Sequence, residues 1–160
     1  MMSNVELNCQ IRLAKRTDLA KIHQIEEVIF KGFDQFTFRR FKSLFKSPNA
    51  RFFVCELGSE LAGFGIGLKK KLANGKLMGR VYVIGISPNY QKKGIGQMML
   101  KTVENWLILE GIEFINLETS AMRPHLRTFY EKNNYVFYKN LPDYYEDFDG
   151  IRLRKNKENF

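Results

Sequence analysis

A short loop with two glycines constrains this chain more than any other feature: Gln91-Lys92-Lys93-Gly94-Ile95-Gly96. An apolar segment before it predicts a strand over residues 79–87, and the segment after it has the periodicity of a helix. The apolar residues of that helix share one face: Ile95, Met99, Val103, Trp106 and Leu107. Gly111 ends the helix, and residues 113–119 predict another strand. The order strand, loop, helix, strand indicates a parallel crossover within a sheet.

Further strands are expected on both sides of this crossover, over residues 11–13, 52–55, 61–68, 135–139 and 148–153. The dipeptide Asn74-Gly75 predicts a two-residue hairpin before the strand at 79–87, because both residues tolerate positive φ.

Three more helices complete the predicted fold. The first begins at Thr17-Asp18, with Thr17 as its cap, and ends at Gly32. The second is rich in phenylalanine, from Phe36 to Ser47-Pro48, and the third begins at Pro124 and ends at Asn133, with Asn134 in a left-handed cap. We therefore expect one α+β domain over residues 1–160, with a mixed sheet of six or seven strands and about four helices.

Composition narrows the class of protein. The net charge of +9, from 26 Lys and Arg against 17 Asp and Glu, favours an anionic partner or is simply a solvated basic surface. No apolar run approaches the roughly 20 residues of a membrane helix. The first residues lack the pattern of a signal peptide, so a cytoplasmic location is expected.

The cysteines and histidines indicate neither a scaffold nor a metal site. Cys9 and Cys55 are the only cysteines, and two in a chain with a core of its own do not suggest a disulfide scaffold. His23 and His125 lie far apart in unrelated contexts, and no Cys/His cluster has metal-ligand spacing. We expect both histidines to be structural or surface residues.

The glycine loop has the properties of an anion site. Gly94 and Gly96 leave room for a ligand to approach the backbone, and the helix that follows starts with unpaired N–H groups. The helix dipole and the charges of Lys92 and Lys93 add to the attraction. The loop is neither a P-loop nor a dinucleotide-binding motif. An ordinary glycine-containing turn is the alternative interpretation.

The pattern Gln91-x-x-Gly94-x-Gly96 after a strand resembles the [QR]-x-x-G-x-[GA] fingerprint of the GNAT family of N-acetyltransferases. The resemblance implies the GNAT fold and acetyl-CoA as cofactor, with its pyrophosphate on this loop. It also implies a bulge at Ile84-Gly85-Ile86, whose backbone pairs with the pantetheine arm and polarises the thioester carbonyl. From the residues alone, a plain buried strand is equally compatible. The implied cofactor contacts are Ile84, Gly85, Ile86, Gln91, Lys92, Lys93, Gly94, Ile95, Gly96, Gln97 and Arg123.

Two further residues fit the chemistry of acetyl transfer, which needs a base for the amine and a proton for the departing thiolate. Glu118 stands near the end of the strand at 113–119, where a carboxylate is unusual. Tyr130 follows twelve residues later on a short helix. The alternatives are a carboxylate at a solvated strand end and an aromatic packing residue.

This second half resembles the branch of the family that acetylates the N-terminal alanine of a ribosomal protein. Leu117-Glu118, Phe129-Tyr130-Glu131 and Tyr144-Tyr145 reproduce the spacings of that branch. The resemblance implies Glu118 as general base, Tyr130 as general acid, and Tyr144 and Tyr145 as contacts of the acceptor. Arg123 stands where the branch has asparagine, Asn134-Tyr135 replaces Gly-Phe, and the acidic segment of the last strand is not clearly present, which leaves the acceptor open.

The expected function is transfer of an acetyl group from acetyl-CoA to a primary amine, at a protein or peptide N-terminus. One alternative is a small-molecule amine as acceptor, and another is a non-catalytic module that binds CoA or an anion. The acidic residues Asp143, Glu146 and Asp147 would attract a positively charged amine, and they argue against a nucleic-acid partner. The sequence does not indicate an oligomeric state.

Overall fold

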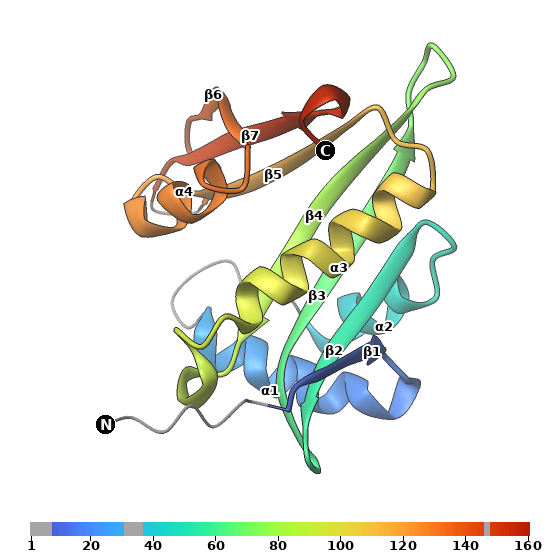
Figure 1. The fold of residues 1–160 in the computed structure, drawn as a ribbon, viewed down its shortest axis with the longest axis vertical. Helices are drawn as coiled ribbons and strands as arrows, with labels where there is room; N and C mark the ends of the chain where they lie inside the picture. Colours follow the sequence, from blue (N-terminus) through green and yellow to red (C-terminus); the bar gives the residue numbers. More distant parts are fainter. Residues whose placement is uncertain (1–7, 31–36, 146–147) are drawn as a thin grey trace.

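The computed structural model describes residues 8–30, 37–145 and 148–160. Seven strands form one sheet in the order β1-β2-β3-β4-β5-β7-β6 (Figure 1). Their bounds are β1 Gln10–Leu13, β2 Ala50–Leu57, β3 Glu60–Lys71, β4 Leu77–Ile86, β5 Phe114–Ser120, β6 Val136–Leu141 and β7 Gly150–Asn156. All neighbours are antiparallel except β4 and β5, which are parallel. The predicted mixed α+β sheet with one parallel crossover is confirmed.

Helices cover both faces of the sheet. The bounds of the helices are α1 Leu19–Ile29, α2 Phe38–Phe45, α3 Ile95–Leu109 and α4 Pro124–Glu131. Figure 1 shows α3 crossing the near face, while α1 and α2 lie behind the sheet and α4 lies beside β5. Along β2, Phe53 and Cys55 pack toward α3, and Phe52 and Val54 pack toward α1 and α2. Residues 52–55 of β2 thus contribute alternately to two cores, as the alternation of side chains along a strand requires.

The sheet divides between β4 and β5. These strands pair only at Gly79 with Ile115 and at Arg80 with Asn116. Beyond Arg80 the two strands diverge, which Figure 1 shows as a widening gap between their ribbons. Residues 81–86 keep their ladder with β3 on one side but form no ladder with β5 on the other. The backbone of β4 therefore has an open edge along the second half of the strand.

A β-bulge lies within β4, but not at the predicted position. Ile66 of β3 pairs with Val83 and Gly67 pairs with Val81, so Tyr82 is the extra residue. The predicted bulge at residues 84–86 is wrong, because these residues pair in regular register with β3. A bulge depends on the register between two strands, and one strand's sequence does not specify that register.

The start of the first helix also differs from its prediction. Thr17 lies in a 3₁₀ turn, Arg16–Asp18, and α1 begins only at Leu19, so Thr17 does not cap it. The carboxylate of Asp18 instead accepts hydrogen bonds from the Lys15 amide and the Arg12 guanidinium. These bonds favour the tighter turn over a side-chain cap. The predicted ends at Gly32 and Phe36 lie outside the described residues.

The hairpin between β3 and β4 is longer than predicted. Of Asn74 and Gly75, only Gly75 has positive φ, at 84°. The amide of Leu72 donates to the carbonyl of Lys76, and the amide of Gly75 donates to the carbonyl of Leu72. The side chain of Asn74 accepts from the Lys76 amide at 3.0 Å, which stabilises a turn that does not need positive φ at Asn74.

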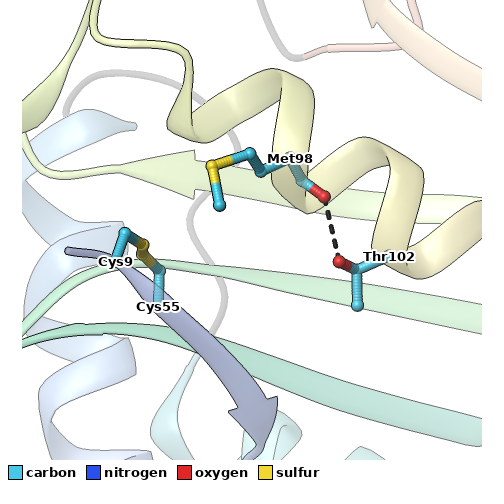
Figure 2. Close-up of a disulfide and its surroundings, with 4 residues drawn as sticks. All are labelled: Cys9, Cys55, Met98 and Thr102. Carbon is cyan, nitrogen blue, oxygen red and sulfur yellow. Dashed lines mark hydrogen bonds between the residues drawn. A yellow bond between two sulfur atoms is a disulfide. The ribbon is translucent and has the colours of Figure 1, made fainter. Parts of the chain in front are cut away.

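Cys9 and Cys55 form a disulfide, which the sequence did not indicate, although one bridge beside two buried cores is not a disulfide scaffold. Their Cα atoms lie 6.0 Å apart, because β1 pairs beside β2 and brings together residues 46 positions apart in the sequence. Figure 2 shows the bridge between the start of β1 and β2, with Met98 of α3 extending toward it. The disulfide therefore fixes the first strand at the edge of the sheet.

A buried ion pair joins α3 to the last strand. Lys155 of β7 and Glu104 of α3 are 1% and 2% exposed, and the Lys155 Nζ donates to the Glu104 Oε2 at 2.7 Å. The hydroxyl of Tyr135 lies 3.4 Å from the other carboxylate oxygen. Burial, with a smaller contribution from Glu104, raises the pKa of Tyr135. This cluster connects α3 with the β5-β7-β6 part of the sheet, which pairs with β4 at only two positions.

The remaining helix-end predictions are confirmed. Gly111 and Asn134 have φ of 81° and 69°, as left-handed caps require, and Pro124 lies in the first turn of α4. Within the described ranges, no helix is both long and apolar enough to cross a membrane.

Candidate active site

A pocket of about 210 Å³ opens where β4 and β5 diverge. Its walls come from the second half of β4, the end of β5, α4, the loop before β7, and the α1–α2 region. The lining residues are Phe30, Arg40, Arg80, Val81, Tyr82, Val83, Ile84, Leu117, Glu118, Thr119, Ser120, Arg123, Leu126, Tyr130, Tyr144 and Tyr145. The predicted catalytic pair and the predicted acceptor contacts therefore meet in one place, although they come from distant parts of the sequence.

Glu118 lies between two arginines. Its side chain is 4% exposed, and the Arg152 Nε donates to its Oε1 at 2.8 Å. The Nε of Arg80 lies 2.7 Å from its Oε2, as an ion pair without the alignment of a hydrogen bond. The antiparallel register places Arg152 directly opposite Glu118, and β4 supplies Arg80 from the other side. Two guanidinium groups therefore contact this one carboxylate.

Arg80 connects this carboxylate to Tyr144, one of the predicted acceptor contacts. One of its terminal nitrogens donates to the Tyr144 hydroxyl at 3.0 Å, and its guanidinium carbon lies 4.9 Å from the centre of the Tyr82 ring. Sequence reasoning missed both Arg80 and Arg152. Arg80 is a charged residue within the apolar segment 79–87, just as Glu118 is a charged residue within a predicted strand. The same signal could therefore have identified Arg80.

Tyr130 holds its proton firmly. Its ring packs against Phe129 and Tyr135, with centroids 5.1 and 5.8 Å away. Its hydroxyl has no hydrogen-bond partner among the described residues. Burial, with a smaller effect of Tyr145, raises the pKa of Tyr130 to about 12. The phenol is therefore protonated at neutral pH and can donate its proton.

The loop before β7 forms one wall of the pocket, and the bulge of β4 lies near another. Tyr144 and Tyr145 pack edge to face, with ring centroids 5.0 Å apart. The Tyr82 hydroxyl accepts from Arg40 of α2 at 2.6 Å, and burial raises the pKa of Tyr82. The acidic residues 146–147 lie outside the described residues.

The glycine loop ends at the N-terminus of α3, and a helix N-terminus is a common place for an anion to bind. Gly94 is the N-cap residue, with φ of 84°, and the first three amides of the helix have no partner within it. A Cβ atom built on Gly96 would meet only the Ile86 side chain, at 3.9 Å, so this glycine is not required by packing within the protein. Lys92 and Lys93 are exposed beside it. The open space and the amides fit a phosphate group.

Some predicted cofactor contacts have other partners in the structure. The side-chain amide of Gln91 donates to the Ile86 carbonyl at 2.9 Å, and that of Gln97 donates to Asn133 at 2.6 Å. A side chain at position 85 would collide with Phe64, so Gly85 could contact a cofactor only through its backbone. Ile84 and Arg123 line the pocket. The cofactor contacts of these residues remain predictions.

No metal centre accompanies the pocket in the part of the chain that the structure describes, since no three His, Cys, Asp or Glu side chains gather there. The lining includes the carboxylate of Glu118 and the phenol of Tyr130, the two groups predicted to transfer protons.

Comparison with known proteins gives a consistent result. Residues 19–135 match the model of the Acetyltransferase (GNAT) family. An uncharacterised N-acetyltransferase of Methanocaldococcus jannaschii is 30% identical over 152 residues, covering 93% of this chain and 92% of the relative.

Solved structures share the fold at lower identity. The ribosomal-protein-S18-alanine N-acetyltransferase of Escherichia coli has a TM-score of 0.76 at 19% identity, covering 92% of this chain and 93% of its own. Arabidopsis thaliana Naa50, in complex with the bisubstrate analogue CoA-Ac-MVNAL, has a TM-score of 0.80 at 15% identity, covering 92% and 98%.

The divided sheet, the glycine loop before α3 and the family match agree with one another. The chain belongs to the GNAT acetyltransferase family and is an acetyl-CoA-dependent N-acetyltransferase.

Proposed function

We propose that this enzyme acetylates the α-amine at the N-terminus of a peptide or protein. The observation that carries the proposal is the meeting of Glu118, Tyr130 and the Tyr144-Tyr145 pair in one pocket at the open edge of β4. Two proteins of the same fold support it: one is named as a ribosomal-protein-S18-alanine N-acetyltransferase, and the other is in complex with the bisubstrate analogue CoA-Ac-MVNAL.

The residues present fit acetyl-CoA. The free amides at the start of α3 and the space beside Gly96 would hold the pyrophosphate, helped by Lys92 and Lys93. The open edge at residues 81–86 would pair with the amide groups of the pantetheine arm, as an added strand pairs with a sheet. Acetyl-CoA supplies an activated acetyl group in its thioester.

Each remaining proton has a residue to carry it. Bound acetyl-CoA would supply the thioester carbonyl carbon for attack by the acceptor nitrogen, so that a C–N bond would form and the C–S bond would break. Glu118 takes the proton that the amine loses, at Oε2, which has no aligned hydrogen bond. Tyr130 gives its proton to the departing thiolate, since its raised pKa keeps the phenol protonated. A backbone N–H of the open edge of β4 would stabilise the oxyanion.

The cofactor site is tested at Gly96. Gly96→Val should weaken acetyl-CoA binding strongly while leaving the thermal stability of the free protein nearly unchanged, because the new side chain enters ligand space rather than the core. The stabilisation of the parent by acetyl-CoA, measured as a shift in Tm, should shrink or vanish in the variant.

Gly58→Ala is a matched control for glycine replacement. Gly58 has φ of 61° and open space around it, and it lies in the β2–β3 turn, so the change should strain the backbone without affecting the cofactor. A Gly96→Val protein that binds acetyl-CoA as tightly as the parent would exclude the loop as the pyrophosphate site.

The acceptor is tested by product analysis. Peptides with a free α-amine and an internal lysine should be acetylated on the α-amine, which mass spectrometry locates. Tyr144→Ala combined with Tyr145→Ala should raise KM for these peptides and spare acetyl-CoA binding. Acetylation only of lysine side chains or of small amines would reject the N-terminal proposal and leave the acetyltransferase activity intact.

A further inference from the structure

The charges that line the pocket are unbalanced. Among its described lining residues, Arg40, Arg80 and Arg123 are cationic, and Glu118 is the only carboxylate. Arg40 and Arg123 have interaction partners of their own, so the inference depends on the groups around Glu118 alone.

The carboxylate of Glu118 is more than neutralised. Arg152 holds one oxygen and Arg80 contacts the other, which gives the three side chains a net charge of +1. The Glu118 side chain is 4% exposed, whereas those of Arg80 and Arg152 are 30% and 26% exposed. In the pocket, an incoming molecule therefore meets the guanidinium of Arg80 before it meets the carboxylate, whereas Arg152 is not a lining residue.

Arg80 is placed to contact an acceptor. Its Nε faces Glu118 and one terminal nitrogen donates to the Tyr144 hydroxyl, while its other terminal nitrogen has no hydrogen-bond partner among the described residues. The Tyr82 ring below and the Tyr144 hydroxyl beside it hold the guanidinium at the pocket wall. A held guanidinium with spare N–H groups binds carboxylates with two parallel hydrogen bonds.

We propose that Arg80 is a specificity-determining residue that selects acceptors with a carboxylate close to the reacting amine. Resting on the proposed function, the preferred acceptors are peptides with aspartate or glutamate as the first or second residue. Peptides with lysine or arginine there, and polyamines, are disfavoured because a second cation would approach Arg80. Of the acidic residues expected to attract a cationic acceptor, Asp143 does not line the pocket, and residues 146–147 lie outside the described residues.

Peptides that differ at a single residue test the proposal. Each carries Glu, Gln or Lys at position 1 or position 2, and kcat/KM is measured for each. The parent should prefer Glu over its neutral isostere Gln by roughly tenfold or more at low salt, because two charges a few ångströms apart interact at least that strongly near a surface. The preference should narrow in high salt.

Variants at Arg80 assign the preference. Arg80→Gln should abolish the Glu-over-Gln ratio, and Arg80→Lys should retain much of it because the charge remains. Arg154→Gln is the matched control: Arg154 is on β7, bonds to Asn116, packs on Phe114 and Tyr138, and does not line the pocket. Its ratio should equal that of the parent. A variant that merely lowers the rate for all peptides would leave the ratio of kcat/KM for Glu and Gln peptides unchanged.

Several results would overturn the proposal. They are equal rates for Glu and Gln peptides in the parent, a preference for Lys, or an unchanged ratio in Arg80→Gln. If Arg80→Gln does not fold, the parent's ratio and its salt dependence still decide. A second arm compares glutamate with a diamine as free acceptors. Acetylation of free amino acids but of no peptide would reject the N-terminal function, while a glutamate preference there would still support the role of Arg80.

Discussion

Replacing Glu118 with glutamine should lower kcat for acetyl transfer by roughly 10²–10⁴-fold at neutral pH, the usual contribution of one proton-transfer group. Glutamine keeps the shape of the side chain and can still accept from Arg152, but it cannot take a proton from the amine. An α-amine has a pKa of about 7.7–8.0, so the free amine becomes abundant at alkaline pH. The deficit of the variant should therefore shrink as the pH rises, which a pH series of kcat would measure.

Glu113→Gln is the matched control for this change. Glu113 directly precedes β5, on which Glu118 lies, but it lies outside the pocket, with only a long ion pair to Lys76 at 4.0 Å. Its activity should equal that of the parent. Unchanged activity of Glu118→Gln at every pH would refute the assignment of the base. A deficit that stays constant with pH would indicate that Glu118 positions the arginines instead.

Removing the cation of the buried pair should have the largest effect on stability. Lys155→Met leaves the Glu104 carboxylate buried without its 2.7 Å partner. Loss of one member of a buried ion pair costs about 3–5 kcal/mol, which for a domain of this size corresponds to a fall in Tm of about 10 °C. Urea denaturation of the free protein would measure the change in the free energy of unfolding.

Two controls separate charge from packing. Lys101 lies 4.0 Å from the same carboxylate but its side chain is 51% exposed, so Lys101→Met should change stability by no more than about 0.5 kcal/mol. The double variant Lys155→Met with Glu104→Met should recover most of the loss, because no charge remains buried. If Lys155→Met alone were as stable as the parent, the Glu104 carboxylate would have to be stabilised by water or by another group.

Local patterns were enough to predict most of the fold. The alternation of apolar and polar residues identified the strands. The face shared by Ile95, Met99 and Val103 identified α3, and these three residues are buried in the structure. Gly111 and Asn134 marked helix ends because left-handed backbone favours these residue types. All of these signals depend on residues within a few positions of each other.

Features that depend on pairing between distant segments could not be predicted in this way. The bulge at Tyr82 follows from the register of β3 against β4, and the Cys9–Cys55 bridge follows from β1 lying beside β2. The same limit applies to the site. Glu118 and Tyr130 were predicted from the resemblance to a family branch whose spacing they reproduce. The contacts of Arg80 and Arg152 with Glu118, by contrast, arise only when β4, β5 and β7 assemble.

The point at which the sheet divides has a mechanical consequence. Arg80 is the last residue of β4 that pairs with β5, through Asn116, and its side chain also holds Glu118 two residues further along β5. Arg80 therefore marks the point where the two strands begin to diverge, and its side chain also contacts the Glu118 carboxylate. A change in the angle between β4 and β5 would pivot at this residue. The same change would alter both the distance between the Arg80 guanidinium and Glu118 and the width of the pocket.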